Sequence, residues 1–102
     1  MDFYNKLVRD KIPEIIKQKG KIPFTHISND REYEKKLKEK LKEEVDEFLK
    51  DTNKKEMADI LEVIDAINWF RGWDMEEITN IKKRKRENRG GFKNKIILDK
   101  IK

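Results

Sequence analysis

Hydrophobic residues recur along the chain at the three- and four-residue spacing of α-helices, and polar or glycine-containing stretches divide the pattern into four segments. We expect helices at about 8–19, from just after 28 or 29 to about 50, at about 54–71 and at about 75–88. No linker or repeat suggests a second domain. The pattern therefore predicts an all-α fold in a single domain, residues 1–102.

Capping residues and glycines mark the ends of these segments. Asn53 with Glu56, and Asp74 with Glu77, have the spacing of a capping box, in which polar side chains satisfy free N–H groups at a helix start. Glycines that can end a helix follow three of the segments: Gly20, Gly72 and Gly90.

The two central segments carry acidic residues at informative spacings. A polar stretch at 50–53 predicts a tight turn, so the two helices would form an antiparallel hairpin in which residues whose numbers sum to about 103 lie opposite each other. Glu47 would then face Glu56, and Glu44 would face Asp59. Glu44 falls within an apolar stripe, and Asp59 lies one turn before another apolar position, so both should point inward.

Inward carboxylates predict a bound cation. Ionised carboxylates gathered in a core repel one another and lose hydration worth several kcal/mol per ion. No basic residue lies in the apolar stripes of Glu44 and Asp59, so we expect a metal ion to balance them. Oxygen ligands without cysteine or a nearby histidine favour Mg²⁺, or Mn²⁺, over zinc. The predicted ligands are Glu44, Glu47, Glu56 and Asp59, and Glu62 with Asp65 repeats the spacing one step later, which leaves these two open as further members.

The same acids have a simpler interpretation. Glu56 can serve only as a helix cap, and lysines at helical spacing can form solvated ion pairs worth a few tenths of a kcal/mol each. For Glu43, Asp46 and Asp51 this interpretation is at least as good as the metal site. The interleaved lysines are Lys40, Lys42, Lys50, Lys54 and Lys55.

The order of the acids resembles a known signature. Glu43-Glu44-x-x-Glu47 followed by Glu56-x-x-Asp59 is similar to the EExxE and ExxD motifs of the MazG-like, all-α nucleoside triphosphate pyrophosphatases. The opening YNKLVRDKIPEII, the run ADILEVIDAI and the closing RGGF resemble the small phosphoribosyl-ATP-pyrophosphohydrolase-like branch of that superfamily, over nearly the whole chain. The link between the two acidic motifs is shorter than the superfamily commonly has.

This resemblance implies a fold and an activity. The fold would be a four-helix, MazG-like bundle completed by homo-oligomerisation, as a homodimer or a dimer of dimers. The activity would be hydrolysis of an NTP or dNTP between the α and β phosphates, giving NMP and pyrophosphate, with magnesium polarising the phosphates and lowering the pKa of a bound water. Glu44 would act as a catalytic metal ligand, and Glu43, beside the ligands but outside the stripe, would be a general base or a group behind the ligands.

The resemblance leaves two substrates open. A house-cleaning enzyme would remove a non-canonical or surplus nucleotide, and we favour this because the similarity is to the stand-alone branch. The alternative is phosphoribosyl-ATP of histidine synthesis.

Charge is unevenly distributed along the chain. Residues 1–81 carry 16 basic and 19 acidic groups, whereas residues 82–102 carry ten basic and two acidic groups. Such a basic end can bind phosphate, attract a nucleic-acid backbone, or only aid solubility. A non-enzymatic helical dimer that binds nucleic acid there is therefore a further alternative, although we regard nucleic acid as a less favoured partner than a nucleotide. The predicted substrate-binding residues are Lys85, Arg89 and Phe92, with Lys6 and Arg9 of the opening motif.

Composition limits the core and the compartment. Of 102 residues, 35% are hydrophobic and 46% charged, so one chain can bury only a small core, and a third helix that is apolar on nearly every side needs a partner. The chain has no cysteine, and we find neither a signal peptide nor an apolar run of membrane-spanning length. These features predict a cytoplasmic protein without a membrane partner.

Overall fold

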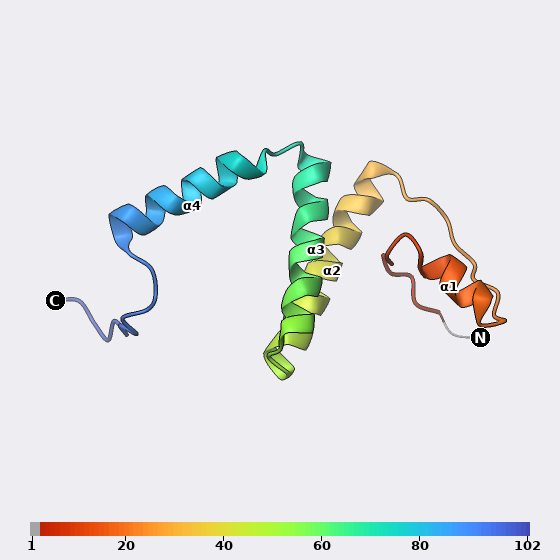
Figure 1. Cartoon of the computed structure of the whole chain (residues 1–102), viewed down its shortest axis with the longest axis horizontal. Helices are drawn as coiled ribbons and strands as arrows, with labels where there is room; N and C mark the ends of the chain where they lie inside the picture. Colours follow the sequence, from red (N-terminus) through yellow and green to blue (C-terminus); the bar gives the residue numbers. More distant parts are fainter. Residues whose placement is uncertain (1–2) are drawn as a thin grey trace. The chain divides into compact units, whose positions relative to one another are not determined.

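The computed structural model describes residues 3–102 and, over that range, has four α-helices and no β-strand (Figure 1). The all-α prediction is confirmed, and the second, third and fourth helices match the expected ranges closely. The helices are α1 (Ile12–Gln18), α2 (Asp30–Lys50), α3 (Lys54–Arg71) and α4 (Met75–Arg89).

The predicted start of the first helix, at Val8, is wrong. A proline in a helix interior removes an N–H and clashes with the carbonyl four residues earlier, so a helix that includes Pro13 does not continue back through Arg9. Pro13 instead lies in the first turn of α1. Residues 3–9 consequently form no regular element and are available for contacts with the rest of the chain.

The contacts divide the described chain into two units, the residues up to Arg71 and Gly72–Lys102. The single domain remains a prediction. No helix in residues 3–102 combines the length and the apolar character required to cross a bilayer.

Helices α2 and α3 form the antiparallel hairpin that the sequence predicts (Figure 1). The turn is closed by the Thr52 hydroxyl, which donates to the Phe48 carbonyl at 2.9 Å, and the Asn53 side chain caps α3 by accepting from the Glu56 N–H at 2.9 Å. Leu37 of α2 and Val63 of α3 are the buried hydrophobic side chains of the described chain. The hairpin therefore sets the register of the acidic residues with very little core behind it.

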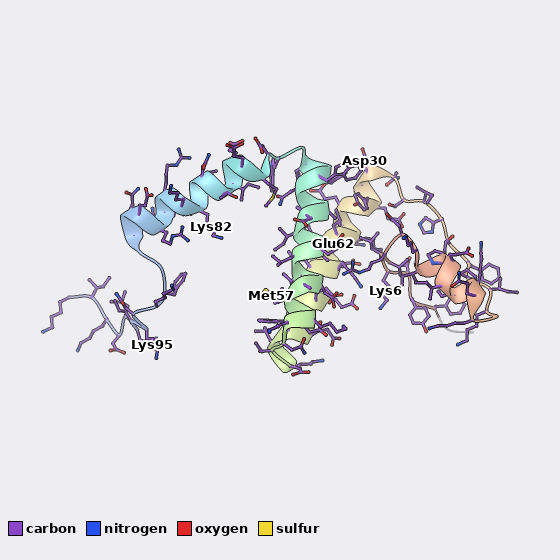
Figure 2. All side chains as sticks on the ribbon, in the orientation of Figure 1. Lys6, Asp30, Met57, Glu62, Lys82 and Lys95 are labelled. Carbon is purple, nitrogen blue, oxygen red and sulfur yellow. The ribbon has the colours of Figure 1, made fainter. Side chains whose placement is uncertain are left out.

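The segment 3–10 lies against this hairpin through polar contacts. Lys36 Nζ of α2 donates to the Asn5 carbonyl at 2.7 Å, and Lys6, which is labelled in Figure 2, has its Nζ 3.3 Å from Glu43 Oε1. Burial, and then the charge of Asp10, raises the pKa of Tyr33, whose ring packs edge-on against Phe70. The segment thus brings basic residues to the helices that carry the acids.

The second unit contains α4 and the C-terminal tail. Asp74 caps α4 as predicted, but its side chain accepts from the Glu76 N–H at 2.9 Å, so the predicted partner Glu77 is wrong by one residue. Gly90 ends the helix at φ +84°, a conformation that strains other residues. None of the α4 residues is buried, and the apolar residues Ile96–Leu98 of the tail are exposed.

Candidate metal centre

Three carboxylates converge on one side of the α2–α3 hairpin. One oxygen each from Glu44 of α2 and from Glu56 and Asp59 of α3 lies within 4.8 Å of the other two. These side chains are only 13%, 15% and 23% exposed. We call them the acidic triad; it contains three of the four predicted metal ligands.

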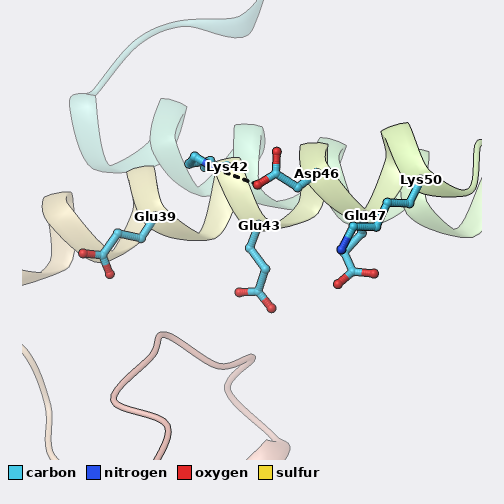
Figure 3. A pocket seen from close by; sticks show the side chains of 6 residues that line it. All are labelled: Glu39, Lys42, Glu43, Asp46, Glu47 and Lys50. Carbon is cyan, nitrogen blue, oxygen red and sulfur yellow. Dashed lines mark hydrogen bonds and ion pairs between the residues drawn. The ribbon is translucent and has the colours of Figure 1, made fainter.

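The fourth predicted ligand, Glu47, is not part of this convergent group among residues 3–102. It lines an open hollow along α2, together with Glu43, the predicted base (Figure 3). In that view Glu39, Glu43 and Glu47 extend from the same side of the helix, as their four-residue spacing requires. Glu62 and Asp65, which the sequence left open, are exposed and also lie outside the triad.

Every carboxylate of the triad has a basic partner. Lys40 Nζ lies 3.3 Å from Glu44, and Lys55 Nζ lies 3.5 Å from Glu56 and 3.3 Å from Asp59. The Arg9 guanidinium donates to the other Asp59 oxygen at 3.0 Å. The basic side chains therefore balance the triad in the protein alone.

These partners contradict the expectation that Glu44 and Asp59 would lack basic neighbours. Lys40 and Lys55 each precede their acid by four residues and reach it along flexible stems, even though they lie outside the apolar stripes. Arg9 arrives from a segment 50 residues away in the chain. The helical spacing of the lysines was a usable signal, whereas the position of Arg9 depends on tertiary structure.

The basic partners also keep Asp59 ionised. Burial raises the pKa of its carboxyl, but the hydrogen bond and charge of Lys55, followed by those of Arg9, outweigh burial and hold the pKa below its ordinary value of 3.8. The same hydrogen bond to Asp59 is the main reason that the pKa of Lys55 is raised. The Asp59 carboxylate is thus charged at any pH near neutrality.

This lowered pKa predicts an acid-sensitive contribution to stability. Because the folded pKa lies below the unfolded one, the contribution is complete above about pH 4 and is lost as the pH falls through the folded pKa. Wild type should exceed Asp59→Asn in free energy of unfolding by up to about 1 kcal/mol at pH 6 in chelator, and the difference should vanish toward pH 2. Urea titrations at fixed protein concentration measure this, and a difference that persists at pH 2 would contradict it.

Of the predicted substrate-binding residues, Lys6 and Arg9 lie beside the acids. Lys6 Nζ is 3.3 Å from Glu43 and 5.9 Å from the centre of the Tyr4 ring. Lys85, Arg89 and Phe92 belong to the second unit, so the geometry of the hairpin leaves their predicted role untested.

The donor set of the acidic triad fits a hard divalent cation. All three groups are carboxylates, and Mg²⁺ and Mn²⁺ prefer such oxygen ligands. Exposed acidic groups often gather without a metal, but these three are mostly shielded from solvent and come from two helices. Comparison of the chain with protein-family models, with curated proteins and with solved structures finds no match.

Proposed function

We propose that this protein is a magnesium-dependent nucleotide pyrophosphohydrolase that cleaves an NTP or dNTP between the α and β phosphates, with Mn²⁺ as an alternative ion. The observation that carries the proposal is the convergence of Glu44, Glu56 and Asp59, at the positions of the EExxE and ExxD motifs. A binding module has no evident need to gather three shielded carboxylates. The motifs supply the proposed reaction, and the triad supplies a place for its ion.

The residues of the chain would divide the work of this reaction. Glu44, Glu56 and Asp59 would hold the ion, which supplies charge neutralisation of the phosphates and a more acidic water. Glu43 would take the proton of the attacking water, whose oxygen bonds to the α phosphorus. The bond from that phosphorus to the bridging oxygen breaks, and pyrophosphate leaves with the electron pair. Arg9 and Lys6 are close enough to the acids to contact the phosphates.

The preferred substrate class is a non-canonical or surplus nucleotide, which would make the protein a cytoplasmic house-cleaning enzyme. Phosphoribosyl-ATP is the alternative substrate.

Assembly as a homodimer, or as a dimer of dimers, is part of the proposal. Helix α3 leaves the large apolar side chains of Leu61 and Trp69 52% and 76% exposed, and a second copy of the chain would cover them. The homodimer would also cover apolar side chains of α3 that the α2–α3 hairpin of one chain leaves exposed.

A nucleic-acid-binding dimer is the second candidate, and the charge distribution favours it. The residues up to Arg71 carry 16 basic and 16 acidic groups, whereas Gly72–Lys102 carries ten basic and five acidic groups, so the second unit holds the whole net charge. A backbone-binding surface would have this bias. The candidate does not explain the acidic triad.

A turnover screen with and without metal separates these functions. With millimolar Mg²⁺, we expect at least one canonical or modified nucleotide to yield equal amounts of monophosphate and pyrophosphate, and the same ion should raise the melting temperature by binding the folded state. A chelator should remove both effects. If neither Mg²⁺ nor Mn²⁺ changes melting or turnover, and the protein instead binds single-stranded nucleic acid with strong salt dependence, the second candidate is correct.

A further inference from the structure

The acidic triad is balanced by basic side chains of two kinds. Lys40 and Lys55 belong to the same helices as the acids they contact, and helical spacing keeps them there. Arg9 belongs to the segment 3–10, as does Lys6, which lies beside Glu43. The contact between this segment and the helices therefore uses Asp59, one of the three carboxylates that a metal would require.

The segment has weak additional anchors. Phe3 and Tyr4 are exposed, and Lys36 supplies the backbone contact through the Asn5 carbonyl at 2.7 Å. A cleft separates the segment from α2, and its charged lining residues are Lys6, Lys36 and Lys40 together with Glu39 and Glu43. Partly exposed ion pairs contribute at most about 1 kcal/mol each, so a divalent ion can replace them.

We propose that Arg9 is a positioning residue that couples the metal to the nucleotide, an inference that rests on the proposed function. In the protein alone, its guanidinium donates a hydrogen bond to the Asp59 carboxylate. A cation bound to Asp59 repels the guanidinium and releases it, and the polyphosphate of a nucleotide then becomes its acidic partner. We call the segment 3–10 the strap. The ion detaches the strap from Asp59, and the phosphates then hold it through Arg9.

The exchange makes two opposite demands on Arg9. Before the nucleotide arrives, Arg9 competes with the metal for Asp59, so removing its charge should tighten metal binding. Once the metal is bound, Arg9 contacts phosphate, so removing it should weaken nucleotide binding. By linkage, each ligand then strengthens the other. If Arg9 were only a structural clamp, removing its charge would lower the stability of the protein. It would neither tighten metal binding nor weaken nucleotide binding.

The test compares Arg9→Gln with wild type in two titrations. Calorimetric titration with Mn²⁺ alone should show affinity about three- to fivefold higher in the variant, the size of a partly exposed ion pair. With saturating Mn²⁺, a nucleoside triphosphate analogue bearing a methylene bridge between the α and β phosphorus should bind about tenfold more weakly, the loss of a charge-assisted phosphate contact. Arg9→Lys should lie close to wild type in the first titration.

Lys11→Gln is the matched control, because it also removes one positive charge, two residues from Arg9. The described structure gives the Lys11 side chain no ion pair. It should change neither titration by more than about twofold.

Hydrogen exchange adds a direct measurement of the strap. Mn²⁺ should increase exchange within residues 5–10 of wild type, and Arg9→Gln should already exchange fast without it. If Arg9→Gln does not fold, Lys55→Gln provides the competition test, since Lys55 is 79% exposed and shares Asp59.

The outcomes distinguish the two proposals. Wild type that binds no metal overturns the metal centre and the strap together. Wild type that binds Mn²⁺, with Arg9→Gln of equal or lower metal affinity or with unchanged nucleotide affinity, overturns the strap alone. Slower exchange of residues 5–10 on adding Mn²⁺ does the same.

Discussion

Glu44→Gln and Asp59→Asn are each expected to reduce pyrophosphate release by about a thousandfold or more, because the charge stabilisation supplied through these carboxylates amounts to several kcal/mol. Both substitutions keep the shape of the side chain and remove its charge. Each acid is one of three whose oxygens lie within 4.8 Å of one another, so neither has an evident substitute. Product analysis at saturating Mg²⁺ measures the loss.

The structure changes what these variants should do to stability. The repulsion expected between inward carboxylates alone implies that neutralising one of them would leave the metal-free fold intact or even stabilise it. Since Glu44 contacts Lys40, and Asp59 contacts Lys55 and Arg9, we instead expect a loss of up to about 1 kcal/mol without metal. Destabilisation in chelator therefore no longer separates a metal ligand from a structural ion pair.

The response of the melting temperature to metal distinguishes a metal ligand from a structural ion pair. Wild type should melt higher in millimolar Mg²⁺ than in chelator, and both variants should lose most of that rise. Asp46→Asn is the control, because Asp46 pairs with Lys42 on the same helix yet lies outside the triad. It should retain both turnover and the metal response. Turnover that survives in both Glu44→Gln and Asp59→Asn would remove the acidic triad from the mechanism.

The hairpin could be predicted from the sequence because its determinants are local. The Asn53 cap, the polar turn and the apolar spacing act within a few residues, and together they fix which acids share a height. Glu44, Glu56 and Asp59 were predicted as neighbours for this reason. Glu47 was included because it faces Glu56 across the hairpin and completes the EExxE motif, but it lies outside the convergent group of the described residues.

The rest of the centre depends on contacts that no local pattern encodes. Pro13 shortens α1 and leaves Arg9 outside any helix, but only the tertiary structure brings Arg9 to Asp59, 50 residues later. Lys40 and Lys55 were visible as helical neighbours of the acids, yet an extended side chain can equally point to solvent. The sequence therefore predicted the acids of the centre and offered Lys40 and Lys55 only within the simpler ion-pair interpretation, whereas it gave no signal that Arg9 contacts Asp59.

We also expect assembly to have a large effect on the stability of the protein. Leu37 and Val63 are the buried hydrophobic residues of the described chain, whereas Leu61 and Trp69 of α3 are 52% and 76% exposed. We expect a chain with so little core to need a partner for its stability.

We therefore expect an obligate homodimer whose melting temperature rises by a few degrees for each tenfold increase in protein concentration. Leu61→Glu places a charge on the exposed apolar side of α3, so it should dissociate the dimer and lower the melting temperature by about 10 °C or more, whereas Leu61→Met, which keeps size and apolar character, should change little. Sedimentation and melting over a concentration series measure both effects. A wild-type monomer that melts cooperatively at micromolar concentration, with a midpoint independent of concentration, would show that the exposed apolar side of α3 has another role.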